Sequence, residues 1–408
     1  MENSKVRRYA SRRVSHLPPV RLLQATNVTS SSPGQPLRVL HVASGDLWAG
    51  AEVQLFHLLS SLRRRTEVTV EAAILNPGKL ADRLREQGIP VWQFDESRMS
   101  SAAIAKALVR IARTQGAQVI HTHRTKENIL GTLAAVCTPY GVALRTAHGR
   151  PEHGIGRFGK RLILNAADRI AARFQRATIG VSAELCGYLR QAYPGRPVYH
   201  IPNGIDPDLV RQEALLPCSY PPSDAFTVGF LGRLVPVKRV DVFLEMARAL
   251  CTHAPGRFRF AVAGDGPLER ALRAKASELA IESAVDFLGF QQNSAALLSR
   301  MDCLALTSDH EGMPMVVLEA LALGVPIVAH SVGGLPELLT GSPIGHLVPS
   351  QDPAQLAQAI EAVARQAGPR SESAARASAL PGQLDSRQSV LRYIEIYRSI
   401  ARAPIAQN

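Results

Sequence analysis

Two carboxylates that bracket a turn are the most informative feature of this sequence. Glu311 and Glu319 enclose the residues GMPMVVL. Gly312 lets the backbone approach a ligand closely, and Pro314 suits the first turn of a helix, whose free N–H groups can bind an anion. A diphosphate fits this helix end, with Glu319 about one turn into the helix for the hydroxyls of a ribose and Glu311 beside a sugar. Alternatively, the carboxylates only complement the helix dipole.

A second group of chemically active side chains follows an apolar run. The segment GRLVPVKR, residues 232–239, offers the planar guanidinium of Arg233 and the point charge of Lys238. This pair suits a diphosphate whose negative charge grows as its bond to a sugar breaks. Surface cations are also common in such loops. The turn AGDGP likewise lets the backbone of Gly264 and Gly266 approach a ligand, or is a simple turn.

Predicted strands and helices alternate and must position these groups. The alternation favours mostly parallel sheets covered on both faces, an α/β fold. Several predicted strands end in a polar residue, and ligands lie at the carboxyl ends of strands in open α/β sheets. The expected strands are 38–43, 68–75, 119–123, 143–148 and 177–182 in a first series, and 226–232, 258–263, 285–288, 302–306 and 326–329 in a second.

The two series predict two Rossmann-like domains, residues 37–207 and 208–384. Residues 1–36 form a basic, Ser-rich tail that we expect to be disordered. Pro- and Ser-rich residues 217–224 favour an interdomain linker there. An amphipathic segment at about 385–408 predicts a closing helix that packs back on the first domain.

The composition is typical of a globular protein that does not bind nucleic acid. With 408 residues and 46% hydrophobic content the chain can bury full-sized cores. Its five cysteines are scattered singly, which favours a reducing compartment, and no apolar stretch suggests a membrane span or a secretory signal. We therefore expect a cytoplasmic protein. The net charge of +13 favours an anionic partner, but the aromatic content of 5% argues against nucleic acid.

Together these motifs resemble the C-terminal half of glycosyltransferase family 4 over roughly residues 226–340, with weaker similarity over about 38–204. The motifs are Gly232 to Lys238, Gly264 to Pro267, Glu311 to Glu319, GVP at 324–326 and GGLPE at 333–337. The resemblance implies the GT-B fold, two Rossmann-like domains facing each other across a cleft. It also implies a retaining transfer of a hexose from a UDP- or GDP-sugar, with no other cofactor and no obligatory metal.

The resemblance also implies roles for single residues. AGAE at 49–52 resembles the family's glycine loop, although Ala49 replaces the first expected glycine. His148 matches the strand-end histidine that the family places beside the donor sugar and the acceptor, and His123 follows another predicted strand. We expect His148 and Glu311 as catalytic groups. The expected donor-binding residues are Gly50, Arg233, Lys238, Gly264, Gly266, Gly312, Met313, Pro314, Met315 and Glu319.

A segment of basic and apolar residues suggests where the protein binds its acceptor. From Arg150 to Arg176 seven Lys or Arg residues are interleaved with apolar ones. Such a segment can lie on anionic lipid, or it can be a core-packed helix with a solvated basic face. We expect a peripheral enzyme of cell-surface polysaccharide assembly at the inner face of the plasma membrane. Its acceptor would be a glycan or a lipid-linked molecule.

Three other interpretations stay open beside glycosyl transfer. They are a sugar-nucleotide epimerase or a phosphorylase of the same fold, and a non-catalytic membrane-binding module. The complete segment from Glu311 to Glu319 favours transfer over all three. Asp206 and Asp208 have the spacing of a metal-binding Asp-x-Asp motif, but they follow a turn and are interpreted as part of a hinge.

Overall fold

The computed structural model describes residues 35–149, 158–366 and 380–402, and for 158–162 the backbone alone. The features below belong to one compact unit, residues 36–408. Most of the tail predicted at 1–36 lies outside the described residues, as do the first residues of the basic segment, 150–157.

The first domain is built on a seven-stranded parallel sheet with the order β3-β2-β1-β4-β5-β6-β7. Its strands are β1 (Leu37–Ser44), β2 (Val68–Leu75), β3 (Val91–Phe94), β4 (Val119–Thr122), β5 (Val142–Ala147), β6 (Gln175–Gly180) and β7 (Val198–His200). Its helices are α1 (Gly50–Arg63), α2 (Lys79–Glu86), α3 (Ser101–Thr114), α4 (Thr125–Val136), α5 (Phe158–Phe174) and α6 (Ala183–Ala192).

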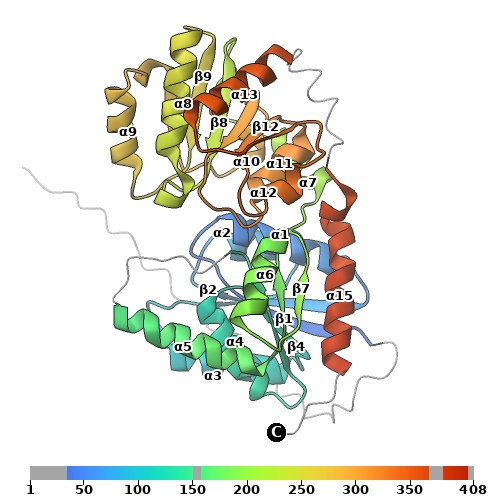
Figure 1. Cartoon of the computed structure of the whole chain (residues 1–408). Coiled ribbons are helices and arrows are strands. Elements are labelled where there is room, and N and C mark those ends of the chain that lie inside the picture. Colours follow the sequence, from blue (N-terminus) through green and yellow to red (C-terminus); the bar gives the residue numbers. More distant parts are fainter. Residues whose placement is uncertain (1–34, 150–157, 367–379, 403–408) are drawn as a thin grey trace, which may run out of the picture. The chain divides into compact units, whose positions relative to one another are not determined.

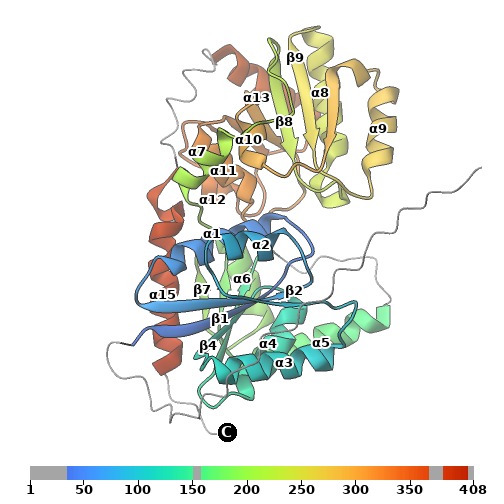
Figure 2. The same ribbon diagram turned by 180° about the vertical axis from the view of Figure 1, so that it is seen from behind.

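Alternation along the strands sends side chains to two cores. Val39 and Ala43 of β1 pack with α1 and α2, whereas Leu40 and Val42 pack with α3 and α4. Helix α15 (Ser386–Arg402), from the end of the chain, joins the first of these cores and contacts α1. Both views show α15 alongside the first sheet (Figures 1 and 2).

The second domain repeats the plan with a six-stranded parallel sheet, in the order β10-β9-β8-β11-β12-β13. Its strands are β8 (Phe226–Leu231), β9 (Phe258–Ala263), β10 (Val285–Gly289), β11 (Cys303–Leu306), β12 (Ile327–His330) and β13 (Gly345–Val348). Its helices are α7 (Pro207–Ala214), α8 (Val240–His253), α9 (Glu269–Glu278), α10 (Ser294–Leu298), α11 (Met315–Leu323), α12 (Leu335–Leu339) and α13 (Pro353–Gln366). Short 3₁₀ helices lie at Pro236–Lys238, Glu282–Ala284 and Gly382–Leu384. The predicted α/β architecture is confirmed.

The chain crosses from the first domain to the second before residues 217–224, the segment whose composition suggested the interdomain linker. Helix α7, which precedes that segment, already contacts α10 and α11 of the second domain. Asp206 caps α7, because its carboxylate accepts the N–H groups of Asp208 and Leu209 at 3.1 and 3.4 Å. The Pro- and Ser-rich residues therefore form a connection from α7 to β8, and the Asp-x-Asp spacing belongs to a helix cap.

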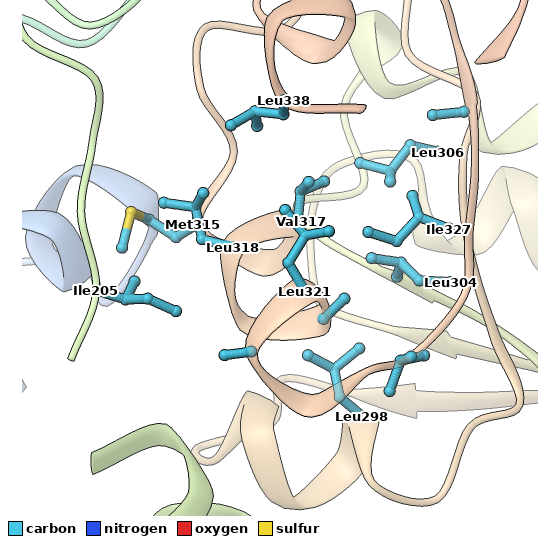
Figure 3. Packing of buried hydrophobic residues seen from close by; sticks show 14 of the residues in the cluster. Ile205, Leu298, Leu304, Leu306, Met315, Val317, Leu318, Leu321, Ile327 and Leu338 are labelled. Atoms are coloured by element: carbon cyan, nitrogen blue, oxygen red, sulfur yellow. The ribbon is translucent and has the colours of Figure 1, made fainter. Parts of the chain in front are cut away.

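Helix α11 is fixed in the core of the second domain. It begins after Pro314 and ends at Gly324, whose positive φ of 67° is a favourable end for a helix. Figure 3 shows the apolar face of α11 directed at side chains of β11 and β12. The packed residues are Val317, Leu318, Leu321, Leu304, Leu306 and Ile327. The N-terminal end of α11 is thereby held rigidly at the carboxyl edge of the sheet.

Candidate functional site

The predicted donor residues lie at the point where the strand order of the second sheet reverses. Strands β8 and β11 are neighbours, and the chain leaves them for β9 and β12 on opposite sides. A crevice forms outside the carboxyl ends of two such strands. The loop with Arg233 and Lys238 follows β8, and the loop with Glu311 follows β11.

Lys238 and Glu311 form an ion pair. The Lys238 Nζ atom lies 2.6 and 2.8 Å from the two carboxylate oxygens of Glu311, and the Ser308 hydroxyl donates to the same carboxylate at 2.6 Å. The side chain of Glu311 is 6% exposed and that of Lys238 is 24% exposed. A cation predicted for a diphosphate and a carboxylate predicted for a sugar thus pair with each other.

Arg233 is exposed, and it makes no hydrogen bond or ion pair with the residues that the structure describes. Its loop rests on the turn with Gly264 and Gly266, whose φ angles are +133° and +156°. A Cβ atom on Gly264 would lie 1.9 Å from the Gly232 carbonyl oxygen. These glycines bring two loops together, and their contact with a ligand stays a prediction.

The N-terminal ends of two helices lie close together at this site. A Cβ atom on Gly50, the first residue of α1, would lie 3.8 Å from Cγ of Met315, the first residue of α11. Pro314 is the N-cap of α11, one position before the first turn in which it was expected, and its φ of −70° suits both places. Asn203 fixes the preceding residue, because its side-chain amide donates to the Met313 carbonyl at 2.8 Å. Both helix ends offer free N–H groups and a positive dipole end.

Glycines also bring the loops of His148 and Glu311 into contact. A Cβ atom on Gly312 would lie 2.3 Å from the carbonyl oxygen of His148, and one on Gly334 would lie 2.1 Å from that of Gly312. The N–H of Gly334 donates to the Gly312 carbonyl oxygen at 3.0 Å. The two residues predicted as catalytic therefore stand on adjoining loops, one from each domain.

Glu319 forms no ion pair with the cations of the site. It is buried on α11, and burial raises the pKa of its carboxyl to about 7, against the lowering effect of a hydrogen bond with Ser294. Within the described residues its carboxylate makes no hydrogen bond to Arg233 or Lys238. This carboxyl therefore keeps its proton to a higher pH than an exposed glutamate does, which no sequence pattern indicated.

At the start of α1 a glutamate takes the place of a side-chain cap. Ala49 has no side-chain acceptor, and its N–H donates instead to the Glu52 carboxylate at 3.2 Å. Glu52 also pairs with Arg124, while burial raises the pKa of its carboxyl. Ser44, Glu52, Arg124 and His123 line a small hollow of the first domain. His123 thus lies beside the helix end that was predicted to approach the diphosphate.

Three further histidine contacts surround His123, and sequence reasoning missed two of the residues. His41 and His121 are fully buried, and the pairing of β1 with β4 sets them opposite each other. Because His121 and His123 are two positions apart in the predicted strand 119–123, their shared face was available as a signal, although β4 itself ends at Thr122 and His123 follows it. Ring nitrogens of His41, His121 and His123 lie within 4.8 Å of one another, close enough for a metal. Both nitrogens of His121, however, already contact Tyr397 and Thr146.

Comparison with known proteins identifies the family that this chain resembles. Residues 48–209 match the family described as Glycosyltransferase Family 4, and residues 225–366 match that described as Glycosyl transferases group 1. The chain is 34% identical over 260 residues to D-inositol 3-phosphate glycosyltransferase of Mycobacterium tuberculosis, covering 61% of this chain and 51% of that protein. The chain therefore spans about half the length of the curated relatives it matches.

Solved structures share the fold. Anabaena HepE in complex with UDP-glucose superposes with a TM-score of 0.68 at 22% identity, over 90% of this chain and 98% of that one. A glycosyltransferase from Rickettsia africae superposes with a TM-score of 0.69 at 17% identity, over 90% and 100%. These likenesses show the GT-B fold. Since the two matched family regions together take in both α/β domains, the chain belongs to the family 4 glycosyltransferases.

Proposed function

We propose that this protein is a retaining glycosyltransferase that moves a hexose from a nucleotide diphosphate sugar to a glycan or lipid-linked acceptor. The observation that carries the proposal is the Lys238–Glu311 ion pair beside the N-terminal end of α11, with the start of α1 close by. Cations and free N–H groups stabilise the charge that grows on a departing diphosphate. No metal is required for that task.

The ion pair suggests how the donor is bound. An incoming diphosphate competes with Glu311 for Lys238, so that binding releases the carboxylate to accept hydroxyls of the sugar. The nucleoside diphosphate then leaves on the face that the acceptor attacks, and the acceptor O–H proton passes to the departing phosphate oxygen. Interactions that strengthen as this charge develops raise the rate of the chemical step. We propose a UDP-sugar as donor, because HepE of the same fold was solved with UDP-glucose.

A donor screen by thermal shift tests this function. We expect a UDP-hexose to raise the melting temperature, and saturation at about one hundred times Kd adds roughly 2.7 kcal/mol to the free energy of unfolding. Arg233→Ala should abolish the shift and leave the ligand-free melting temperature unchanged, because Arg233 is exposed and pairs with no described residue. Arg270→Ala, at another exposed position of the same domain, is the matched control.

The screen separates the competing functions. An epimerase would convert the donor without an acceptor, and a phosphorylase would require free phosphate in place of a nucleotide. Stabilisation by no nucleotide sugar at all would contradict the proposal.

We further propose that α5 and its neighbours bring the enzyme to an anionic membrane on the cytoplasmic side. Apolar side chains of α5 stand exposed among the exposed cations Arg169 and Arg173. They are Ile163, Leu164, Ile170 and Phe174, and Leu133 and Val136 of the adjoining α4 are exposed as well. Exposed apolar groups among cations suit the boundary between headgroups and acyl chains. In the described part of the chain no helix has the length and apolar character to cross a bilayer.

Vesicle sedimentation tests this surface. The wild-type chain should bind phosphatidylserine-containing vesicles and be released by salt. The double substitution Ile170→Ser, Phe174→Ser should weaken binding at least tenfold, since burying each such side chain contributes about 1.5–3 kcal/mol. Leu215→Ser, at an exposed apolar side chain of the second domain, should bind like the wild type. Equal binding by all three chains would refute the assignment of this surface.

A further inference from the structure

Three histidines of the first domain form a hydrogen-bonded chain that ends at the proposed site. Nε2 of His148 lies 3.2 Å from Nδ1 of His123, and Nε2 of His123 lies 3.1 Å from Nδ1 of His41. The ring planes are nearly parallel, at 26° and 17°, with centroids 5.5 and 5.4 Å apart. The ring nitrogens are close together while the ring centroids are far apart, so each N···N contact lies near the planes of the two rings. The N–H bond and the nitrogen lone pair also point in these planes. Each contact is therefore a hydrogen bond rather than a face-to-face stack.

Helix α15 supplies the other end of this chain. The hydroxyl of Tyr397, a fully buried residue, lies 3.4 Å from Nε2 of His41 and 2.7 Å from Nδ1 of His121. Nε2 of His121 in turn lies 2.8 Å from the Thr146 hydroxyl. The Tyr397 hydroxyl thus joins two histidine branches inside the core.

All four rings are neutral at physiological pH. Burial lowers the pKa of His41 to about 3 and that of His148 to about 4, and it holds the pKa values of His121 and His123 well below their ordinary value. A neutral imidazole has one N–H and one lone pair. In a row of such rings the direction of one hydrogen bond consequently sets the direction of all the others.

The distances at Tyr397 indicate that direction. At 2.7 Å the contact with His121 has the length of a bond donated by a hydroxyl, whereas 3.4 Å to His41 is long. If the single hydroxyl proton goes to His121, the oxygen can only accept the Nε2–H of His41. His41 Nδ1 then accepts from His123, and His123 Nδ1 accepts from His148. Nδ1 of His148 keeps its lone pair, and this buried atom has no partner among the described residues.

We propose that Tyr397 is a positioning residue that acts through His41 and His123 to keep Nδ1 of His148 free of a proton, ready to accept a hydrogen bond from a sugar hydroxyl. The ligand class, a sugar, rests on the proposed glycosyl transfer. The arrangement of protons does not rest on it, because that arrangement follows from contacts among the chain's own residues.

NMR of the full chain labelled with ¹⁵N-histidine tests the proposal, with the His148 signals assigned by their loss in His148→Gln. In the wild type Nδ1 of His148 should carry no proton. Tyr397→Phe removes the acceptor for His41, so both tautomers of His148 should appear. With the transferred sugar donor, kcat should fall roughly tenfold to hundredfold at an unchanged donor KM.

Tyr393→Phe is the matched control. Tyr393 is equally buried one turn earlier on α15, and its hydroxyl faces Thr146 and Gln54 but makes no hydrogen bond to His41, His123 or His148, the rings that set the tautomer. It should leave both the tautomer and kcat unchanged. A proton on Nδ1 of His148 in the wild type, or an unaltered tautomer in Tyr397→Phe, would overturn the proposal. The tautomer measurement needs no donor, so a failure of the glycosyltransferase assignment would be recognised separately as an absence of transfer.

Discussion

Replacing Lys238 with alanine should lower kcat/KM for sugar transfer by roughly 10²–10³-fold, the loss typical for one group that stabilises charge in the transition state. Lys238 is the cation already held inside the site, at 2.6 Å from Glu311. Steady-state kinetics with the donor found by thermal shift measures the effect. The loss should fall mainly on kcat, because the charge on the diphosphate grows as the bond to the sugar breaks.

The same substitution also leaves the buried Glu311 carboxylate without its cation, at a cost to folding of roughly 1–3 kcal/mol. The double substitution Lys238→Met, Glu311→Gln removes both charges and should regain most of that stability while transfer stays low. Lys275→Ala is a matched control in the same domain, since Lys275 is 28% exposed and pairs with Glu245 away from the site. Recovery of activity in the double variant would show that Lys238 matters only for folding.

The positions of the site residues in the fold could be predicted because they depend on local sequence. The strands before Arg233 and Glu311 are continuous apolar runs, and β8 and β11 end close to where those runs end. A parallel sheet then brings the following loops to one edge, whatever their separation along the chain. The ion pair between Lys238 and Glu311 could not be predicted, because each side chain was assigned to a ligand and not to the other side chain.

Contacts that depend on strand register and on tertiary packing could not be predicted from the sequence. His41 and His121 face each other only because β1 pairs with β4 in one register. Tyr397 reaches them from a helix 276 positions further along than His121. The glycines at 264 and 266 were recognised as special, but the close neighbour that requires Gly264 is the Gly232 carbonyl of another loop. A glycine in the sequence can indicate that the backbone is crowded at that position, but it does not identify the neighbouring atoms.

Glu319→Gln should change how stability depends on pH. Burial raises the pKa of the folded carboxyl from 4.5 to about 7, so the folded chain keeps a proton that the unfolded chain has released between these values. This contribution to stability is fully present below about pH 4.5 and is lost as pH rises through about 7. Glutamine does not titrate. The free energy of unfolding of the variant relative to the wild type should therefore rise by roughly 3 kcal/mol from about pH 4.5 to about pH 8.

Urea denaturation at several pH values measures this difference, with Glu278→Gln at an exposed position of α9 as the control that should follow the wild type. The donor adds a second, independent readout. If the ionised carboxylate accepts two ribose hydroxyls, donor binding favours the charged form and must release a proton near neutral pH. Affinity for the donor should then rise with pH up to about 7, and calorimetry in buffers of different ionisation enthalpy should detect the proton. In Glu319→Gln both the proton release and the pH dependence should vanish, whereas their persistence would assign them to another group.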